Sequence, residues 1–189
     1  MELQTFIIID ASGMSKSNAI KSAVLVLIVG AATYFAIRQR QERPVAVGDD
    51  APEFSVPTLS SGSLDLKKYR GRVVVLNLWA TWCPPCVEET PSLVRFAEKV
   101  QEHGVAVLSV SVDEDQKALQ DFVGKYHITY PVGRDPLRAL SARYGTYQFP
   151  ETYILDRHGR VAEKVIGPSD WSDPRMESFV LNLAGASHQ

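Results

Sequence analysis

The stretch from Val73 to Cys86 reads VVVLNLWATWCPPC, and it decides the fold. Its first part, Val73–Ala80, is an almost continuous apolar run rich in valine, which is typical of a strand covered on both faces of a sheet. Pro84 suits the first position of a helix, because the N–H at that position has no partner within the helix. The stretch therefore predicts a buried strand that ends just before two cysteines at the start of a helix.

A second strand follows the helix. Apolar residues recur at helical spacing between Pro84 and Gly104, and Gly104 is a candidate for the C-cap. The run VAVLSVSV at Val105–Val112 then repeats the pattern of a buried strand. Strand, helix and strand form a βαβ unit, for which a right-handed crossover is expected. The sequence thus predicts an α/β domain.

The rest of the domain contains shorter elements. Helical patterns occupy residues 115–126, 136–144 and 173–183. Two strand-like runs flank the turn-forming residues Asp156–Gly159, which predicts a hairpin.

The N-terminal region contains an apolar segment at residues 19–37. Its part from Ser22 to Ile37 carries no charge, and about nineteen residues span roughly 28 Å as a helix, close to the thickness of a bilayer core. A cleaved signal peptide is the alternative, but an A-x-A-like site is missing and Arg38 follows at once. We expect a single membrane anchor there, although lysines and arginines on both sides leave its orientation open.

The apolar segment and the strand and helix patterns after it divide the chain into two regions. These are an N-terminal region of residues 1–44, with the anchor, and a folded domain of residues 45–189. Residues 39–50 are polar and are predicted to form a tether. Residues 1–13 show no recognisable role, and Met14 is an alternative start. The net charge of −2, with acids and bases interspersed, argues against nucleic acid as a partner.

Cys83 and Cys86 are the only cysteines of the 189 residues. A structural zinc site needs four ligands, and the four histidines lack metal-binding spacing. Haem attachment requires CxxCH, but Val87 follows Cys86. A disulfide across so short a loop would add little stability. A redox-active dithiol without metal or cofactor is the remaining interpretation.

The helix start sets the chemistry of Cys83. The helix dipole stabilises a thiolate there by about 0.3–1 kcal/mol, and by up to about 2 kcal/mol in a partly buried site, which lowers a thiol pKa from about 8.5 to roughly 7–8. Pro84 and Pro85 remove two amide donors that would otherwise stabilise the thiolate, which favours a reducing couple. Glu89, three residues after Cys86, is a candidate base for the Cys86 proton. Alternatively, Glu89 only complements the helix dipole.

Two motifs resemble the thioredoxin superfamily, and within it the membrane-anchored TlpA/ResA/DsbE-like branch, whose DsbE members are also called CcmG. VVVLNLWATWCPPCVEETP carries the active-site signature, and YGTYQFPETYILDRHG is similar to the segment with the cis-proline. The resemblance covers about 140 residues, from GDDAPEFSVPTL to the last helix. It implies a thioredoxin-like α/β fold with a central mixed β-sheet flanked by helices.

The resemblance also implies roles for individual residues. Cys83 would be the nucleophile and Cys86 the resolving thiol, with Trp82 in the surface that docks the substrate. Pro150 would be the cis-proline facing the disulfide, and Phe149 would offer its backbone to an extended substrate.

The proton partner differs from that of cytoplasmic-type thioredoxins. Those proteins bury an aspartate six residues before the first cysteine, where this chain has Asn77. Glu89 matches the acidic residue that the membrane-anchored branch places after its CxxC. The difference favours Glu89 as the proton partner.

The function that the resemblance implies is reduction of protein disulfides outside the cytoplasmic membrane, with apocytochrome c as one client. Electrons would come from a membrane thiol reductase of the CcdA/DsbD kind. The chain would be a single-pass protein of the cell inner membrane, with its C-terminal domain in the periplasm.

Two other functions remain as alternatives. A thiol peroxidase of the redoxin type would carry threonine where Ala80 precedes Cys83. A Sco-like copper-handling module would use CxxxC, and the spacer here is two residues.

Overall fold

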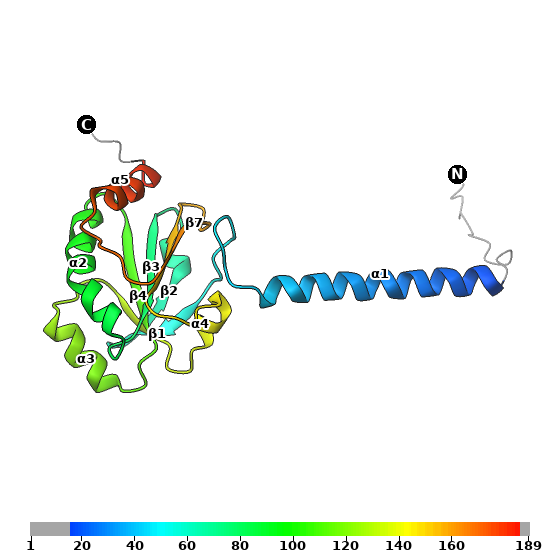
Figure 1. The fold of residues 1–189 in the computed structure, drawn as a ribbon, viewed down its shortest axis with the longest axis horizontal. Helices are drawn as coiled ribbons and strands as arrows, with labels where there is room; N and C mark the ends of the chain where they lie inside the picture. The colour runs from blue at the N-terminus through cyan, green and yellow to red at the C-terminus, as the bar shows by residue number, and fades with distance from the viewer. Residues whose placement is uncertain (1–15, 186–189) are drawn as a thin grey trace, which may run out of the picture. The chain divides into compact units, whose positions relative to one another are not determined.

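The computed structural model describes residues 16–185. In the first helix, it describes side chains only for residue 18 and residues 20–35. The chain divides into two compact units, one up to Arg43 and one from Pro44 onward. Figure 1 shows the elements in chain order: α1 Lys16–Glu42, β1 Ser55–Pro57, β2 Ser63–Asp65, η2 Leu66–Tyr69, β3 Val74–Trp79, α2 Pro84–Gln101, β4 Ala106–Ser111, α3 Gln116–Lys125, β5 Val132–Arg134, α4 Ala139–Tyr144, β6 Glu151–Leu155, β7 Val161–Ile166 and α5 Pro174–Leu183.

The first unit contains helix α1, which includes the segment predicted to be a membrane anchor. Within the described part of the chain, no helix combines the length and the apolarity needed to cross a membrane. The predicted transmembrane helix at residues 19–37 is therefore not confirmed. The side chains of residues 19, 36 and 37 lie outside the described residues, as does Met14.

The second unit is built on a five-stranded sheet with the order β5-β4-β3-β6-β7. Strands β3, β4 and β5 are parallel, whereas β6 is antiparallel to β3 and β7 is antiparallel to β6. The predicted mixed sheet of a thioredoxin-like fold is confirmed, and the parallel pair β3–β4 is the predicted βαβ unit.

Clusters of buried apolar residues cover both faces of this sheet. On one face, Val73 and Val75 pack with residues of α2 and α5. On the other face, Leu76 and Leu78 pack with residues of the β1–β2 region and of α4 (Figure 1). All six residues of β3 are buried, as the almost continuous apolar run predicts. The central strand β3 is thus packed on both faces, and it fixes the position of the loop and the cysteines that follow it.

The structure differs from the sequence prediction at the short elements. Strands β1, β2 and β5 have only three residues each and were not predicted. Helix α4 begins at Ala139 rather than at residue 136, because Arg138 has the left-handed φ of 54° and cannot continue a helix. Helix α2 ends at Gln101, and Gly104, with φ of 78°, lies in the turn that follows.

Candidate active site

The two cysteines form a disulfide at the amino end of α2, directly after the buried strand β3. Cys83 is the N-cap residue and has extended backbone angles, and Pro84 takes the first helical position. Cys86 follows within the first turn, so the two Cα atoms are 5.3 Å apart. The strand-to-helix junction thus places both sulfurs within bonding distance, as the sequence predicts.

The surroundings distinguish the two sulfurs. Cys83 is 5% exposed and Cys86 is 1% exposed, whereas the neighbouring Trp82 is 57% exposed. An incoming disulfide therefore meets Trp82 and Cys83 before Cys86. This order fits Cys83 as the attacking thiol and Cys86 as the resolving thiol, as the resemblance implies.

Phe149, from another part of the chain, lies against the disulfide and directly precedes Pro150. Their peptide bond is cis, and the Phe149 carbonyl oxygen lies 3.3 Å from Cys83 Sγ. The sulfur has no hydrogen in the disulfide, but in the reduced state the thiol can donate to this carbonyl. The Phe149 ring meets Trp82 edge to face, with ring centroids 6.2 Å apart.

Arg138 belongs to this surface and was not predicted from the sequence. Its guanidinium carbon lies 5.7 Å from the centre of the Trp82 ring, within the range of a cation–π contact. Residue 138 is more than fifty positions from Trp82, and no motif marks it. Only the tertiary structure brings this positive charge beside the exposed tryptophan.

Glu89 lies on the buried face of α2, the helix that begins at the disulfide, and its carboxyl accepts three hydrogen bonds. Asn77 Nδ2 donates to Oε1 at 2.9 Å. The backbone N–H of Ser169 and the indole N–H of Trp171 donate to Oε2 at 3.1 and 3.4 Å. The carboxyl thus lies between β3, α2 and the loop before α5, and all three of its hydrogen bonds come from N–H donors.

Burial is the dominant influence on the charge of Glu89, and it raises the pKa of this carboxyl above its ordinary value. The hydrogen bonds from Ser169, Asn77 and Trp171 oppose that shift without cancelling it. A carboxyl with a raised pKa exchanges a proton closer to neutral pH, as a general base requires. Ser169 and Trp171 were not predicted as partners, since they lie about eighty residues after Glu89.

Comparison with known proteins gives the family. The family model described as AhpC/TSA matches residues 47–164, which is more than half of the chain and includes the disulfide. The chain belongs to the AhpC/TSA family.

Several relatives are named for thiol–disulfide chemistry. The thiol-disulfide oxidoreductase ResA of Bacillus anthracis is 31% identical over 173 residues, which cover 90% of this chain and 99% of ResA. A protein of Chlorobium tepidum assigned as the thiol:disulfide interchange protein DsbE superposes with a TM-score of 0.69 and 28% identity, over 75% of this chain and 99% of that chain. A secreted disulfide oxidoreductase of Mycobacterium tuberculosis superposes with a TM-score of 0.59 and 26% identity, over 70% and 95%.

The disulfide and these relatives agree on the chemistry. This member of the AhpC/TSA family is a thiol-disulfide oxidoreductase of the ResA/DsbE type, with Cys83 and Cys86 as its CxxC pair. The predicted membership of the thioredoxin superfamily and of the ResA/DsbE-like branch is confirmed. The roles of Glu89, Trp82, Phe149 and Pro150 stay predictions.

Asp113 fixes the loop that presents the active site of this family member. Its buried carboxylate accepts a hydrogen bond from the Thr81 N–H at 2.9 Å, and further bonds from the hydroxyls of Thr81 and Ser111. Asp113 follows β4, the strand beside β3, so the carboxylate ties the two strand ends together. Thr81 directly precedes Trp82, which makes Asp113 a positioning residue for the CxxC loop.

Replacing Asp113 with alanine should lower the free energy of unfolding by about 2–4 kcal/mol, because three donors lose their acceptor in a buried site. Urea unfolding followed by circular dichroism measures the effect. The neighbouring exposed Glu114 is the matched control, and its replacement by alanine should change stability by less than about 0.5 kcal/mol. Equal effects of the two substitutions would show that Asp113 does not support the loop.

Proposed function

We propose that this chain is a membrane-tethered, extracytoplasmic reductase of protein disulfides. The observation that carries the proposal is the Cys83–Cys86 pair at the amino end of α2, with the buried carboxyl of Glu89 in the same helix. This arrangement supplies a nucleophile, a resolving thiol and a proton acceptor, which are the groups that dithiol exchange requires.

The reaction begins with the reduced protein. The Cys83 thiolate attacks one sulfur of a substrate disulfide, and the substrate's other sulfur leaves as a thiolate and takes up a proton. Cys86 then gives its proton to Glu89, and the Cys86 thiolate attacks Cys83 Sγ. The second substrate sulfur leaves, so the substrate gains two electrons and the protein ends with its own disulfide.

The hydrogen bonding of Cys83 supports the reducing direction. Cys83 Sγ receives a hydrogen bond from the Cys86 N–H at 3.3 Å, whereas Pro84 and Pro85 have no N–H to give. A weakly stabilised thiolate gives electrons more readily than a strongly stabilised one, because stabilising the reduced form makes a dithiol an oxidant.

The direction is tested by equilibrating the protein with glutathione buffers and measuring the fraction of oxidised protein. We expect a reduction potential more negative than about −200 mV, toward the value of about −270 mV for thioredoxin. A potential near about −120 mV, as in a strong oxidant, would contradict a role as reductase. The Cys86→Ser variant, which cannot form the internal disulfide, is the control for the signal.

Helix α1 supports the proposed tether. From Ile20 to Phe35 the described side chains are exposed on every side of the helix, including Val26 and Leu27 at 70% and 72%. Such a surface is unfavourable in water and favourable in lipid. The extracytoplasmic location rests on the resemblance to the membrane-anchored branch and on the relative named as secreted. Sedimentation of the full chain with phospholipid vesicles, lost in a Val26→Lys, Leu27→Lys variant, tests the tether.

The partners are proposed from the same chemistry. Clients are proteins with accessible disulfides, including apocytochrome c, and the electron donor is a membrane thiol reductase of the CcdA/DsbD kind. The exposed ring of Trp82 beside Cys83 offers an apolar contact to an unfolded client segment.

A further inference from the structure

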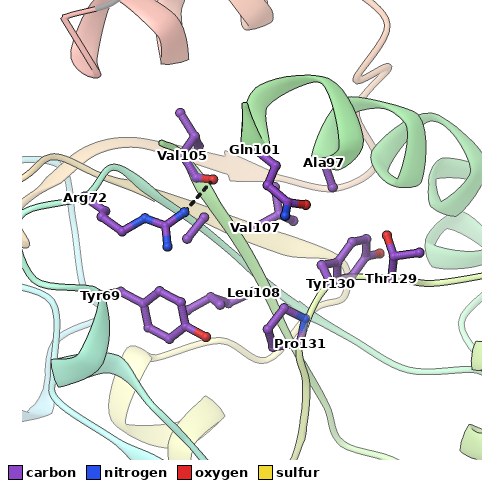
Figure 2. Close-up of a pocket in the computed structure, with 11 residues that line it drawn as sticks. Tyr69, Arg72, Ala97, Gln101, Val105, Val107, Leu108, Thr129, Tyr130 and Pro131 are labelled. Carbon is purple, nitrogen blue, oxygen red and sulfur yellow. Dashed lines mark hydrogen bonds between the residues drawn. The ribbon is translucent and has the colours of Figure 1, made fainter. Parts of the chain in front are cut away.

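A pocket of about 210 Å³ opens at the edge of the sheet, beside the first half of β4 (Figure 2). Its floor is formed by residues 105–108, and Tyr69 and Tyr130 lie on opposite sides of it. Because β3 and β4 are parallel, their amino ends lie together, and Cys83 follows the other end of β3. The pocket and the redox disulfide are therefore at opposite ends of these strands.

The edge of β4 carries an unused pair of backbone groups in this pocket. Strand β5 pairs only with the second half of β4, and the pairing stops where the Ser109 N–H donates to the Pro131 carbonyl at 3.0 Å. Residues two apart in a strand point their N–H and C=O groups to the same side. The N–H and C=O of Val107 therefore face the same edge of β4 as those of Ser109. Pro131 has no N–H to donate to the Val107 carbonyl. Among the described residues, none forms a hydrogen bond to Val107 on this edge.

Arg72 supplies the only charge among the residues that line the pocket. Its Nε donates to the Gly104 carbonyl at 2.9 Å and its Nη2 to the Val105 carbonyl at 3.2 Å, which holds the guanidinium at one end of the floor. Nη1 keeps its hydrogen-bond capacity and points toward the pocket in Figure 2. The lining residues include no aspartate or glutamate, so the pocket favours an anion.

The ends of the floor decide how long a ligand can be. At one end Arg72 occupies the Val105 carbonyl, which an added strand would need. At the other end Pro131 leads directly into β5, which already pairs with β4. An extended peptide therefore cannot pass along the edge of β4 beyond Arg72 at one end or Pro131 at the other. The space accepts one residue, and a chain end fits it better than a chain interior.

We propose that this pocket binds the C-terminal residue of a polypeptide. The amide N–H of that residue donates to the Val107 carbonyl, and its carboxylate accepts from the Val107 N–H and from Arg72 Nη1. These are the two bonds that a hydrogen-bonded residue pair exchanges in an antiparallel sheet, with the guanidinium added. An apolar side chain on the ligand contacts the rings of Tyr69 and Tyr130. The site would hold a partner by its chain end, away from Cys83.

The probe for this site is N-acetyl-L-phenylalanine, which carries one amide, one carboxylate and one apolar side chain. Titrated into the ¹⁵N-labelled full chain in detergent, it should shift the Val107 amide resonance saturably and slow the hydrogen exchange of that amide. N-acetyl-L-phenylalaninamide, which lacks the carboxylate, should bind about tenfold more weakly or worse. No shift of the Val107 amide at millimolar probe, or equal binding of acid and amide, would overturn the proposal and leave a pocket that holds water only.

Two substitutions test the charge. Gln101→Glu adds a negative charge at an exposed position of the pocket and should weaken binding of the acid about tenfold, with little effect on the amide. Arg72→Gln should weaken it similarly, whereas the control Arg175→Gln, at an exposed arginine paired with Asp173 elsewhere, should not. Binding unchanged in Gln101→Glu would contradict the proposal even if the Arg72 variant fails to fold. Disulfide reduction should stay unchanged in Gln101→Glu. A failure of the pocket proposal can therefore be distinguished from a failure of the proposed reductase function.

Discussion

The Cys83→Ala variant should lose disulfide reductase activity, down to the rate of the uncatalysed reaction. Cys83 is the more exposed of the two sulfurs, and it lies at the helix amino end, where the dipole favours the thiolate. Cys86 is buried behind it and cannot reach a substrate disulfide directly. The measurement is the reduction of insulin by dithiothreitol with catalytic amounts of the protein.

Stability provides the control for this loss. The Cys83–Cys86 disulfide closes a loop with only two residues between the cysteines, so its removal costs little loop entropy, and the variant should unfold close to the temperature of the reduced wild type. Insulin reduction retained by Cys83→Ala would assign the attack to another group and contradict the account of the site.

The Glu89→Gln variant should resolve the mixed disulfide about 10²-fold more slowly, at the lower end of the usual contribution of a general base. Glu89 can take the Cys86 proton only as a carboxylate, and burial raises its pKa above the ordinary range. The wild-type rate of resolution should therefore fall as pH drops through that raised pKa, and the variant should lack this dependence. Stopped-flow release of a thiol leaving group, measured across pH, reports both effects.

The exposed neighbour Glu88 provides the matched control, and Glu88→Gln should leave the rate and its pH dependence unchanged. An unaltered profile in Glu89→Gln would leave Glu89 with a structural role only.

Folding stability gives a second measurement on Glu89. Because its folded pKa is raised, the stability from the protonated carboxyl is fully present below the unfolded pKa and is lost as pH rises through the folded pKa. Glu89→Gln should remove that loss, so the free energy of unfolding of the variant should fall less than that of the wild type as pH rises from about 4, near the ordinary glutamate pKa, through the raised pKa of the folded protein.

The elements that carry the cysteines could be predicted because their pattern is local. The valine-rich runs of β3 and β4 and the proline at the start of α2 each depend on a few consecutive residues. The three-residue strands β1, β2 and β5 are too short to show a period of two, and their pairing depends on distant partners.

The environment of Glu89 illustrates what sequence spacing cannot give. The spacing placed Glu89 near Cys86 on the helix, but its hydrogen bonds to Ser169 and Trp171 depend on how the loop before α5 packs. An ion pair was missed for the same reason: Nζ of the partly buried Lys164 lies 2.6 Å from Oε1 of the buried Glu151, which directly follows Pro150. This pair requires the register between β6 and β7, which no local pattern defines.

Trapping of the mixed disulfide tests whether Cys83 is the attacking thiol. A Cys86→Ser variant, reduced and then mixed with two peptide chains joined by one disulfide, should accumulate a covalent adduct of the protein with one of those chains, joined to Cys83, while the other chain leaves as a free thiol. The double variant Cys83→Ala, Cys86→Ser should form none. We expect that adduct to form within the time in which the wild type completes turnover. An absent adduct in Cys86→Ser, or one that forms instead on Cys86 in a Cys83→Ser variant, would show that Cys83 is not the attacking thiol.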